Sequence, residues 1–316
     1  MYRSILDKNQ KQHPVKAVLE MDPSNEIKRT IEKSRHSKAL YLATIVQLNG
    51  AHESMKQLLM TPVSKECGII QLEVSRNASG FNAFNPKYVL TLVLIDAGGS
   101  TTRQDLMVAK KKLVNRTSNY ILSTDIKNPR SKGPAYFGKL RSSTTKKDEY
   151  FLFGPGENPA RVKVGQEARK TFLMTKFEDA NIEGIGKFKK TRCFLPYFSS
   201  EQNIKNYSGV EDPHDLGISK AVHALKNKRP KWSKSKNKYV FKFGARVKDA
   251  SCKNTQLIED FRYDPDTMDT EENAEEVSLT KDNIVFQFGK YDKNTFSLDV
   301  QAPFSRYQAF GLSLAI

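Results

Sequence analysis

The hydrophobic and polar positions at the end of the chain indicate a helix that lacks a polar face. Pro303 suits the first turn of a helix, and the residues after Gln308 are apolar on nearly all sides, with only Ser313 interrupting. Such a helix must be buried all round, and it is too short to span a bilayer, which takes roughly 20 apolar residues. We therefore predict a short helix over residues 303–316, enclosed by a closed sheet. A terminal helix packed on one face of an open sheet is the alternative.

The chain before this helix has the periodicity of β-strands. Residues 70–75 alternate between apolar and polar positions, and residues 88–95 form a nearly continuous apolar run. Further strands are predicted over residues 106–109, 117–124, 135–142, 150–153, 169–178, 191–195, 239–247, 256–258, 283–288 and 294–300. A short helix is predicted over residues 215–226, before a basic run at 226–238 around Trp232. The pattern therefore predicts a mostly β fold.

Residues 1–61 differ from the rest in being polar and basic, and they predict an N-terminal tail that is partly helical or disordered. Its clearest helix covers residues 25–48, with Asp22 and Ser24 as candidate caps. This helix is either a partner-binding element or a solvated extension. The β domain is then expected over residues 62–316.

The charge balance points to an anionic partner. The chain has 52 Lys and Arg against 35 Asp and Glu, a net charge of +17. Residues 259–276 carry nine acidic side chains and one Arg, so the remainder is more basic still. Either nucleic acid or the anionic face of a membrane would suit this charge. The acidic segment is either a solvated insert or a competitor for the basic surface.

Residues with catalytic chemistry are scattered. The five histidines, His13, His36, His52, His214 and His223, have no metal-ligand spacing, and no nucleophile elbow or Walker motif occurs. Three cysteines lie far apart, and no apolar N-terminal run precedes them, which favours a reducing, cytosolic setting. We expect a binding module rather than an enzyme, with no cofactor and no metal.

Residues 135–142 form the most informative strand. Alternation puts Lys139 and Arg141 on one face together with Phe137, and puts Tyr136, Gly138 and Leu140 on the other. Two cations held side by side on a rigid strand can grip one phosphate, at about 1.5–3 kcal/mol for each charge-assisted hydrogen bond. A solvated basic strand face is the alternative.

Several segments resemble the signature of the Tubby family (tubby-like proteins). They are residues 116–123 (RTSNYILS), 136–142 (YFGKLRS), 230–232 (PKW), 239–256 (YVFKFGARVKDASCKNTQ), 283–289 (NIVFQFG) and 308–310 (QAF). They occur in the family's order and at about its spacing, and the resemblance covers about residues 62–316.

The resemblance implies a closed antiparallel barrel of twelve strands around a central, hydrophobic C-terminal helix. It also implies binding of phosphatidylinositol 4,5-bisphosphate at the cytoplasmic leaflet. Carried over residue by residue, the headgroup contacts would be Lys139 and Arg141, with Asn119 as an amide ligand and Arg169 beside them. Arg306 departs from a mostly apolar family position, and we expect it at the mouth of the barrel with its head in solvent.

The resemblance further implies a membrane-tethered adaptor in the trafficking of membrane proteins or in signalling. Its partners would be the intraflagellar transport machinery and membrane-protein cargo. We expect a cytoplasmic protein that is peripheral at the plasma membrane, with the cilium or the nucleus as further sites. The alternative is a nucleic-acid-binding transcription regulator, but the basic run has no stacking aromatic beyond Trp232 and no groove-reading helix is evident.

Overall fold

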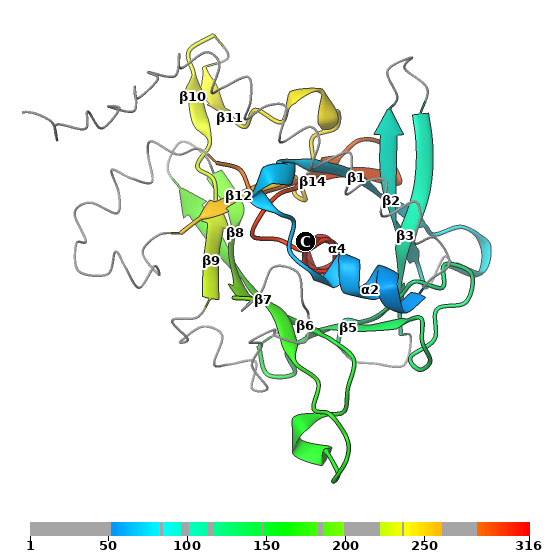
Figure 1. The fold of residues 1–316 in the computed structure, drawn as a ribbon. Coiled ribbons are helices and arrows are strands. Elements are labelled where there is room, and N and C mark those ends of the chain that lie inside the picture. Colours follow the sequence, from blue (N-terminus) through cyan, green and yellow to red (C-terminus); the bar gives the residue numbers. More distant parts are fainter. Residues whose placement is uncertain are drawn as a thin grey trace, which may run out of the picture.

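Twelve strands within the described residues close into an antiparallel barrel (Figure 1). The computed structural model describes residues 52–82, 85–95, 101–112, 117–146, 148–182, 186–198, 222–235, 237–260 and 283–316. Around the barrel the order is β1, β14, β13, β12, β9, β8, β7, β6, β5, β4, β3, β2, which then returns to β1. The predicted fold class is confirmed.

The strand bounds follow the predicted segments closely along most of the chain. They are β1 Ile70–Asn77, β2 Lys87–Ile95, β3 Thr101–Lys111, β4 Asn119–Ser123, β5 Tyr136–Ser142, β6 Glu149–Phe153, β7 Thr171–Ile182, β8 Gly186–Pro196, β9 Val222–Asn227, β12 Thr255–Glu259, β13 Phe286–Lys290 and β14 Thr295–Val300. Two short strands, β10 Lys231–Ser233 and β11 Lys238–Val240, pair outside the barrel. Every pairing between these strands is antiparallel, and away from the register shifts in the β2–β3, β4–β5 and β6–β7 pairs the barrel strands present alternate side chains to the interior.

The last helix, α4 Arg306–Ala315, occupies the middle of the barrel (Figure 1). Ser305 caps it: its Oγ accepts a hydrogen bond from the Gln308 backbone N–H at 3.1 Å, and Gln308 Oε1 accepts from the Ser305 N–H at 2.9 Å. Residues 306–313 of the helix are all buried. The predicted enclosed helix is confirmed, although it begins at Arg306 rather than near Pro303.

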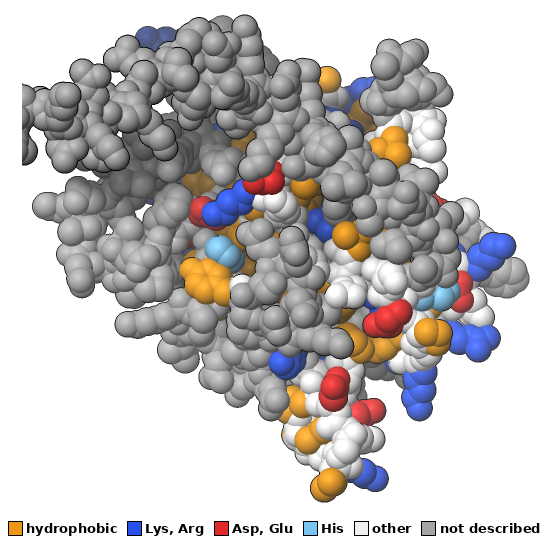
Figure 2. All heavy atoms as spheres, viewed as in Figure 1, with side chains coloured by type: hydrophobic (Ala, Val, Ile, Leu, Met, Phe, Trp, Pro, Cys, Tyr) orange, Lys and Arg blue, Asp and Glu red, His pale blue; other side chains and the backbone are white. Residues whose placement is uncertain are grey.

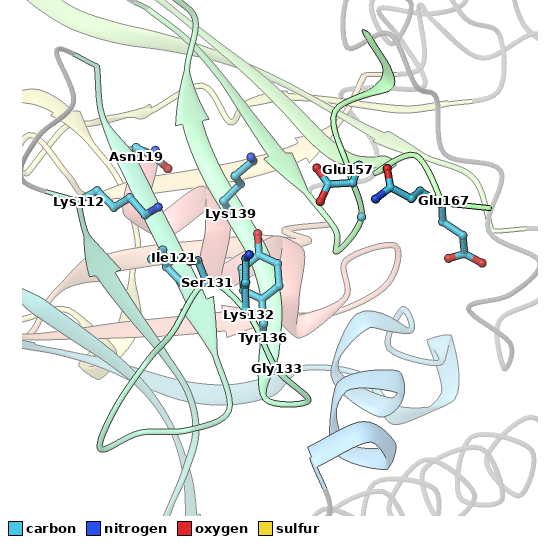
Figure 3. Close-up of a pocket in the computed structure, with 12 residues that line it drawn as sticks. Lys112, Asn119, Ile121, Ser131, Lys132, Gly133, Tyr136, Lys139, Glu157 and Glu167 are labelled. Atoms are coloured by element: carbon cyan, nitrogen blue, oxygen red, sulfur yellow. The ribbon is translucent and has the colours of Figure 1, made fainter. Parts of the chain in front are cut away.

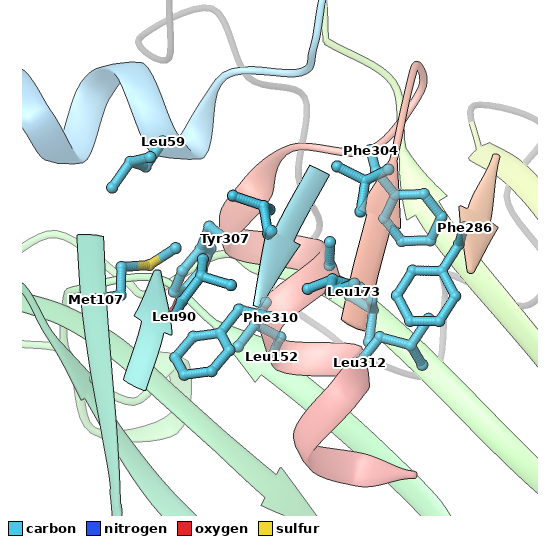
Figure 4. Close-up of a cluster of buried hydrophobic side chains, with 14 of the residues drawn as sticks. Leu59, Leu90, Met107, Leu152, Leu173, Phe286, Phe304, Tyr307, Phe310 and Leu312 are labelled. Atoms are coloured by element: carbon cyan, nitrogen blue, oxygen red, sulfur yellow. The ribbon is translucent and has the colours of Figure 1, made fainter. Parts of the chain in front are cut away.

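The aromatic and aliphatic side chains of α4 fill the barrel interior (Figure 4). Tyr307 stacks on Phe137 of β5 with ring centroids 5.2 Å apart. Its hydroxyl donates to the carbonyl of Phe153 on β6 at 2.6 Å. The amide of Gln308 donates to the carbonyl of Phe172 on β7 at 2.7 Å. The helix is therefore fixed to three neighbouring strands by both packing and hydrogen bonds.

Helix α2, His52–Met60, covers one end of α4 through its buried residues Leu59 and Met60. Arg306 lies beneath it, is 1% exposed, and donates from Nη2 to the Leu58 carbonyl at 2.7 Å. The prediction that Arg306 keeps its head in solvent is therefore wrong, because α2 covers that side chain. The boundary at residue 62 stays a prediction, although α2, just before it, packs against the barrel.

Two predicted segments differ in the structure. Residues 222–226, the last part of the predicted short helix, belong to β9, because pairing with β8 and β12 on either side closes the wall of the barrel; residues 215–221 lie outside the described residues. Residues 239–247 were predicted as one strand, but β11 ends at Val240 and a 3-10 turn follows at Gly244–Arg246. Arg246 in that turn donates to Asp299 of β14 at 2.8 Å and pins the segment against the outside of the barrel.

Some expectations fall outside the described residues. These are the helix over residues 25–48 and nearly all of the acidic segment beyond Asp260. Asp260 itself pairs with Lys226 Nζ at 3.0 Å. Among the helices that the structure describes, none combines the length and apolar character needed to cross a membrane.

Candidate anion-binding site

A β-bulge in β5 sets the geometry of the site. Asn119 of β4 pairs with Arg141, and Ile121 pairs with Lys139, but the register then shifts so that Ser123 pairs with Tyr136. Phe137 is the extra residue, and it is fully buried against α4. The prediction that Phe137 shares a face with Lys139 is therefore wrong. Tyr136 lies on that side instead, whereas the shared outward face of Lys139 and Arg141 agrees with the prediction.

Gly138, beside the bulge, links the site to the core. Its φ is +153°, and a Cβ placed there would run into the Phe153 carbonyl oxygen and the Tyr307 hydroxyl. These two groups form the hydrogen bond that holds α4 to β6. A residue without a side chain is required here, and the strand that carries the cations is thereby held against the central helix.

The outer face of β4 and β5 opens into a cavity of about 520 Å³ (Figure 3). Five segments contribute to it: the residue after β3, strand β4, the β4–β5 loop, strand β5 and the β6–β7 loop. Its lining is Lys112, Asn119, Ile121, Ser131, Lys132, Gly133, Tyr136, Lys139, Gly156, Glu157, Gln166 and Glu167. Figure 3 shows Lys112 and Asn119 on one side, Glu157 and Glu167 toward the other, and Lys139 between them. The cavity is large enough to hold a small polar ligand.

The structure brings the four expected site residues together. Lys139 and Arg141 lie two residues apart on β5, and Asn119 is the direct partner of Arg141. The guanidinium of Arg169 lies 4.4 Å from the ring centroid of Phe153, the residue that pairs with Lys139 on β6. Asn119 and Lys139 line the cavity itself, while Arg141 and Arg169 lie next to those two residues.

The base of the loop between β6 and β7 positions Arg169. The Arg169 backbone N–H donates to the Glu157 carbonyl at 2.8 Å, and the Glu157 N–H donates to the Glu167 carbonyl at 2.9 Å. Gly156 has a φ of +114°, and a Cβ there would lie 2.8 Å from the Arg169 nitrogen. The two backbone segments can approach this closely because one of them has a glycine at the point of contact.

The cations of the site repel one another. Burial, followed by the charges of Arg169, Arg141 and Lys112, lowers the pKa of Lys139 to about 8, and Glu157 offsets this only in part. Burial, together with Arg141, also lowers the pKa of Arg169. A perturbed group in a cavity is a frequent property of functional sites. The site therefore carries uncompensated positive charge that an anion would relieve.

Three polar atoms at this site are buried and lack a hydrogen-bond partner among the described residues. They are Asn119 Oδ1, Arg141 Nε and Arg169 Nε. Leaving a polar group buried and unpaired costs about 1–3 kcal/mol, and more for a charged one. The two N–H groups could donate hydrogen bonds to an anion, and the amide oxygen could accept one from a hydroxyl group of the same ligand.

Sequence reasoning missed several cavity residues, namely Lys112, Lys132, Tyr136, Glu157 and Glu167. The charge of the two lysines was visible in the sequence, but their convergence with β5 depends on how the barrel brings distant loops together. Tyr136 was assigned to the opposite face because the bulge has no evident signal in the sequence. Within the residues that the structure covers, no group of three His, Cys, Asp or Glu side chains could hold a metal ion.

A model of the Tub family matches residues 59–316. Tubby protein homolog 1 of Caenorhabditis briggsae is 26% identical over 84% of this chain and 60% of its own length. Tubby-related protein 2 of Mus musculus is 27% identical over 83% of this chain and 44% of its own. Protein king tubby of Anopheles gambiae is 29% identical over 66% of this chain and 43% of its own. The chain thus spans about half the length of these curated relatives.

Proposed function

Because this chain belongs to the Tub family, we propose that it is a tubby-like membrane adaptor that binds phosphatidylinositol 4,5-bisphosphate through the cavity on β4 and β5. The observation that carries the proposal is the set of buried, unpaired polar atoms on Asn119, Arg141 and Arg169 beside the repelling charge of Lys139. A ligand with at least two phosphates and free hydroxyls satisfies all four groups at once.

Each residue has a role that follows from its chemistry. Arg141 and Arg169 supply planar guanidinium groups that can bind phosphate oxygens in two directions, and Lys139 supplies a mobile point charge between them. The amide oxygen of Asn119 accepts a hydrogen bond from an inositol hydroxyl. Lys112 and Lys132, at the rim, add attraction of about 1 kcal/mol each toward an anionic leaflet.

The shape of the site favours a small headgroup over nucleic acid. A cavity of about 520 Å³ closed on one side by Glu157 and Glu167 suits a compact, hydroxylated anion. Reading a duplex needs a helix or ribbon that enters a groove, together with an open track of positive charge. The glutamates would repel a continuous phosphate backbone at that edge.

The adaptor role extends this proposal to the N-terminal tail, of which only residues 52–61 are described. The barrel would attach to the cytoplasmic face of the plasma membrane, and the tail over residues 1–61 would recruit the intraflagellar transport machinery. Membrane-protein cargo, with the cilium or the nucleus as a destination, belongs to the same proposal and rests on the family resemblance.

Vesicle co-sedimentation across phosphoinositide isomers at physiological salt tests the headgroup site. We expect Lys139→Ala combined with Arg141→Ala to abolish binding to vesicles that contain the 4,5-bisphosphate lipid, with an unchanged circular dichroism spectrum. The matched control is Lys65→Ala with Lys293→Ala, which removes the same charge from exposed positions beside β1 and β14. Equal loss in both double variants, or equal binding to every anionic lipid and to DNA, would refute a headgroup site on β5.

A further inference from the structure

The connection between β6 and β7, residues 154–170, projects from the barrel as a protruding loop, drawn in green at the bottom of Figure 1. Its base forms one wall of the anion cavity through Glu157 and Glu167. Its tip, residues 161–165, carries two exposed valines: Val164 has 107% of its reference exposed area and Val162 has 39%. Large hydrophobic side chains are thus displayed next to a site for a charged ligand.

The tip is held in one shape. The Gln166 N–H donates to the Lys163 carbonyl at 3.0 Å, and Gly165 has a φ of +83°. These are the marks of a type II turn, with glycine at its third position and Val164 at its apex. The Gln166 side chain also accepts from the Lys163 N–H at 3.1 Å. Because the turn is ordered by these bonds, it presents Val164 outward without a large entropic cost on binding.

The composition of the tip suits a lipid surface. Arg161 precedes Val162, Lys163 lies between the two valines, and no acidic residue lies between Glu157 and Glu167. Figure 2 shows hydrophobic and basic side chains together at the end of this loop. A single exposed valine is ordinary, but one at the apex of the turn and a second just before it, interleaved with cations, match the boundary between anionic headgroups and acyl chains.

The tip lies close to the cavity along the chain. Val164 lies three residues from Glu167, so the two are separated by at most about 10 Å. Peripheral elements that insert into a membrane bury their apolar side chains about 5–10 Å into the boundary between headgroups and acyl chains. A lipid whose headgroup occupies the cavity would therefore lie within reach of the tip.

We propose that residues 161–165 form a membrane-inserting tip, in which Val162 and Val164 enter the headgroup–acyl boundary while Arg161 and Lys163 contact lipid phosphates. This inference rests on the proposed function in so far as the ligand of the cavity is the headgroup of a membrane lipid. The tip supplies a second attachment, and two weak attachments on one body bind far more firmly than either alone.

Two measurements on the full chain separate the tip from the cavity. The first is partition onto phosphatidylcholine vesicles with 5 mol% phosphatidylinositol 4,5-bisphosphate, and the second is calorimetric titration with soluble inositol 1,4,5-trisphosphate. We expect Val162→Asp with Val164→Asp to weaken vesicle partition at least about tenfold, because burial of two valines is lost and two anions are added. Affinity for the soluble headgroup should stay the same. Val164→Leu should tighten vesicle partition a few-fold.

The control is Ile69→Asp, which replaces another exposed apolar side chain by an acidic one, at a position 48% exposed before β1 on the far wall of the barrel; it adds one negative charge where the double valine variant adds two. Vesicle partition that is unchanged in the double valine variant, or lowered equally by Ile69→Asp, overturns the tip while leaving the headgroup site intact. Loss of affinity for the soluble headgroup in that variant also overturns it, because the valines would then act on the cavity. A wild-type chain that binds neither probe refutes the proposed function itself.

A fluorescent probe tests insertion directly. Val164→Cys in a Cys252→Ser background can be labelled selectively, because Cys252 is exposed whereas Cys67 and Cys193 are buried. An environment-sensitive dye at this position should shift its emission to the blue on vesicles containing the bisphosphate lipid. Lipids brominated on the acyl chain should quench it. Emission that stays at its aqueous wavelength while the protein is vesicle-bound rules out the inserting tip.

Discussion

The barrel wall formed by β5, β6 and β7 differs between its two faces in how the polar groups are paired. On the inner face, the Tyr307 hydroxyl and the Gln308 amide both donate to strand carbonyls at 2.6 and 2.7 Å. On the outer face, the side-chain nitrogens of Arg141 and Arg169 include buried atoms without a partner among the described residues. The polar groups of the inner face therefore stabilise the fold, whereas those of the outer face include donors that the fold leaves unpaired.

Phe153 shows how closely these faces are coupled. Its carbonyl accepts the hydrogen bond of Tyr307 from inside the barrel, while its ring carries the Arg169 guanidinium 4.4 Å from the centroid on the outside. A cation over an aromatic face is stabilised by the ring without being neutralised. The core therefore positions the cations of the site but does not cancel their charge, and the two faces should respond differently to mutation and to pH.

Phe310→Ala is expected to have the largest effect, and to act on the inner face. Phe310 is fully buried on α4 among the core side chains (Figure 4), so truncation leaves a cavity that costs about 3–5 kcal/mol of unfolding free energy. Chemical denaturation followed by circular dichroism measures this. Leu314→Ala, near the end of the same helix and only partly buried, should cost much less. Equal costs would mean that the barrel does not grip the helix along its length.

Local patterns predicted the fold where they agreed with tertiary structure. The apolar end of the chain predicted an enclosed helix, and the alternation in residues 70–75 predicted β1, because a side chain pointing inward in a barrel must be apolar. Pattern failed at β9, where pairing with β8 and β12 decides the conformation. It failed at Arg306 because the side chain is covered by helix α2, and its partner Leu58 lies 248 residues earlier in the sequence.

The site was predictable in part. Spacing alone put Lys139 and Arg141 on one face, and the family resemblance supplied Asn119 and Arg169. Neither approach found Glu157, because it reaches the cavity through a loop whose base is set by Gly156. Alternation cannot detect a bulge, so Tyr136 was placed on the wrong face. Residues from distant loops line the cavity only because the barrel closes, so no single segment of the sequence predicts their meeting.

The binding of an anion on the outer face should depend on pH. The pKa of Lys139 is about 8 in the ligand-free protein, below its ordinary value, and a bound phosphate would raise it again. Binding is then linked to proton uptake, so affinity is greatest below pH 8 and is lost as pH rises through that value. We expect calorimetric affinity for soluble inositol trisphosphate to fall about tenfold between pH 7.5 and pH 9, at roughly 1.4 kcal/mol per pKa unit.

Lys139→Arg provides the control for this titration. An arginine keeps its proton throughout this range, so the variant should bind with an affinity that is nearly independent of pH between 7.5 and 9. Inositol phosphates are already ionised above pH 7.5, and the ligand contributes little to the slope. An equally steep decline in Lys139→Arg would assign the pH dependence to another group.

We expect a smaller effect, a gain in the free energy of unfolding, when the charge of Lys139 on the outer face is removed. Lys139 has a folded-state pKa below its unfolded value, so the unfolded chain binds more protons between pH 8 and pH 10, and the charged lysine costs stability below that window. Lys139→Met should therefore raise the unfolding free energy at pH 7 by about 1 kcal/mol, or Tm by roughly 2–4 °C, while removing headgroup binding. The gain should shrink toward pH 10, where the wild-type lysine is already neutral.

Lys65→Met, on an exposed turn, should leave Tm unchanged at both pH values. A destabilised Lys139→Met would mean that this lysine stabilises the barrel. The contrast between an inner face that stabilises the fold and an outer face that does not would then be wrong.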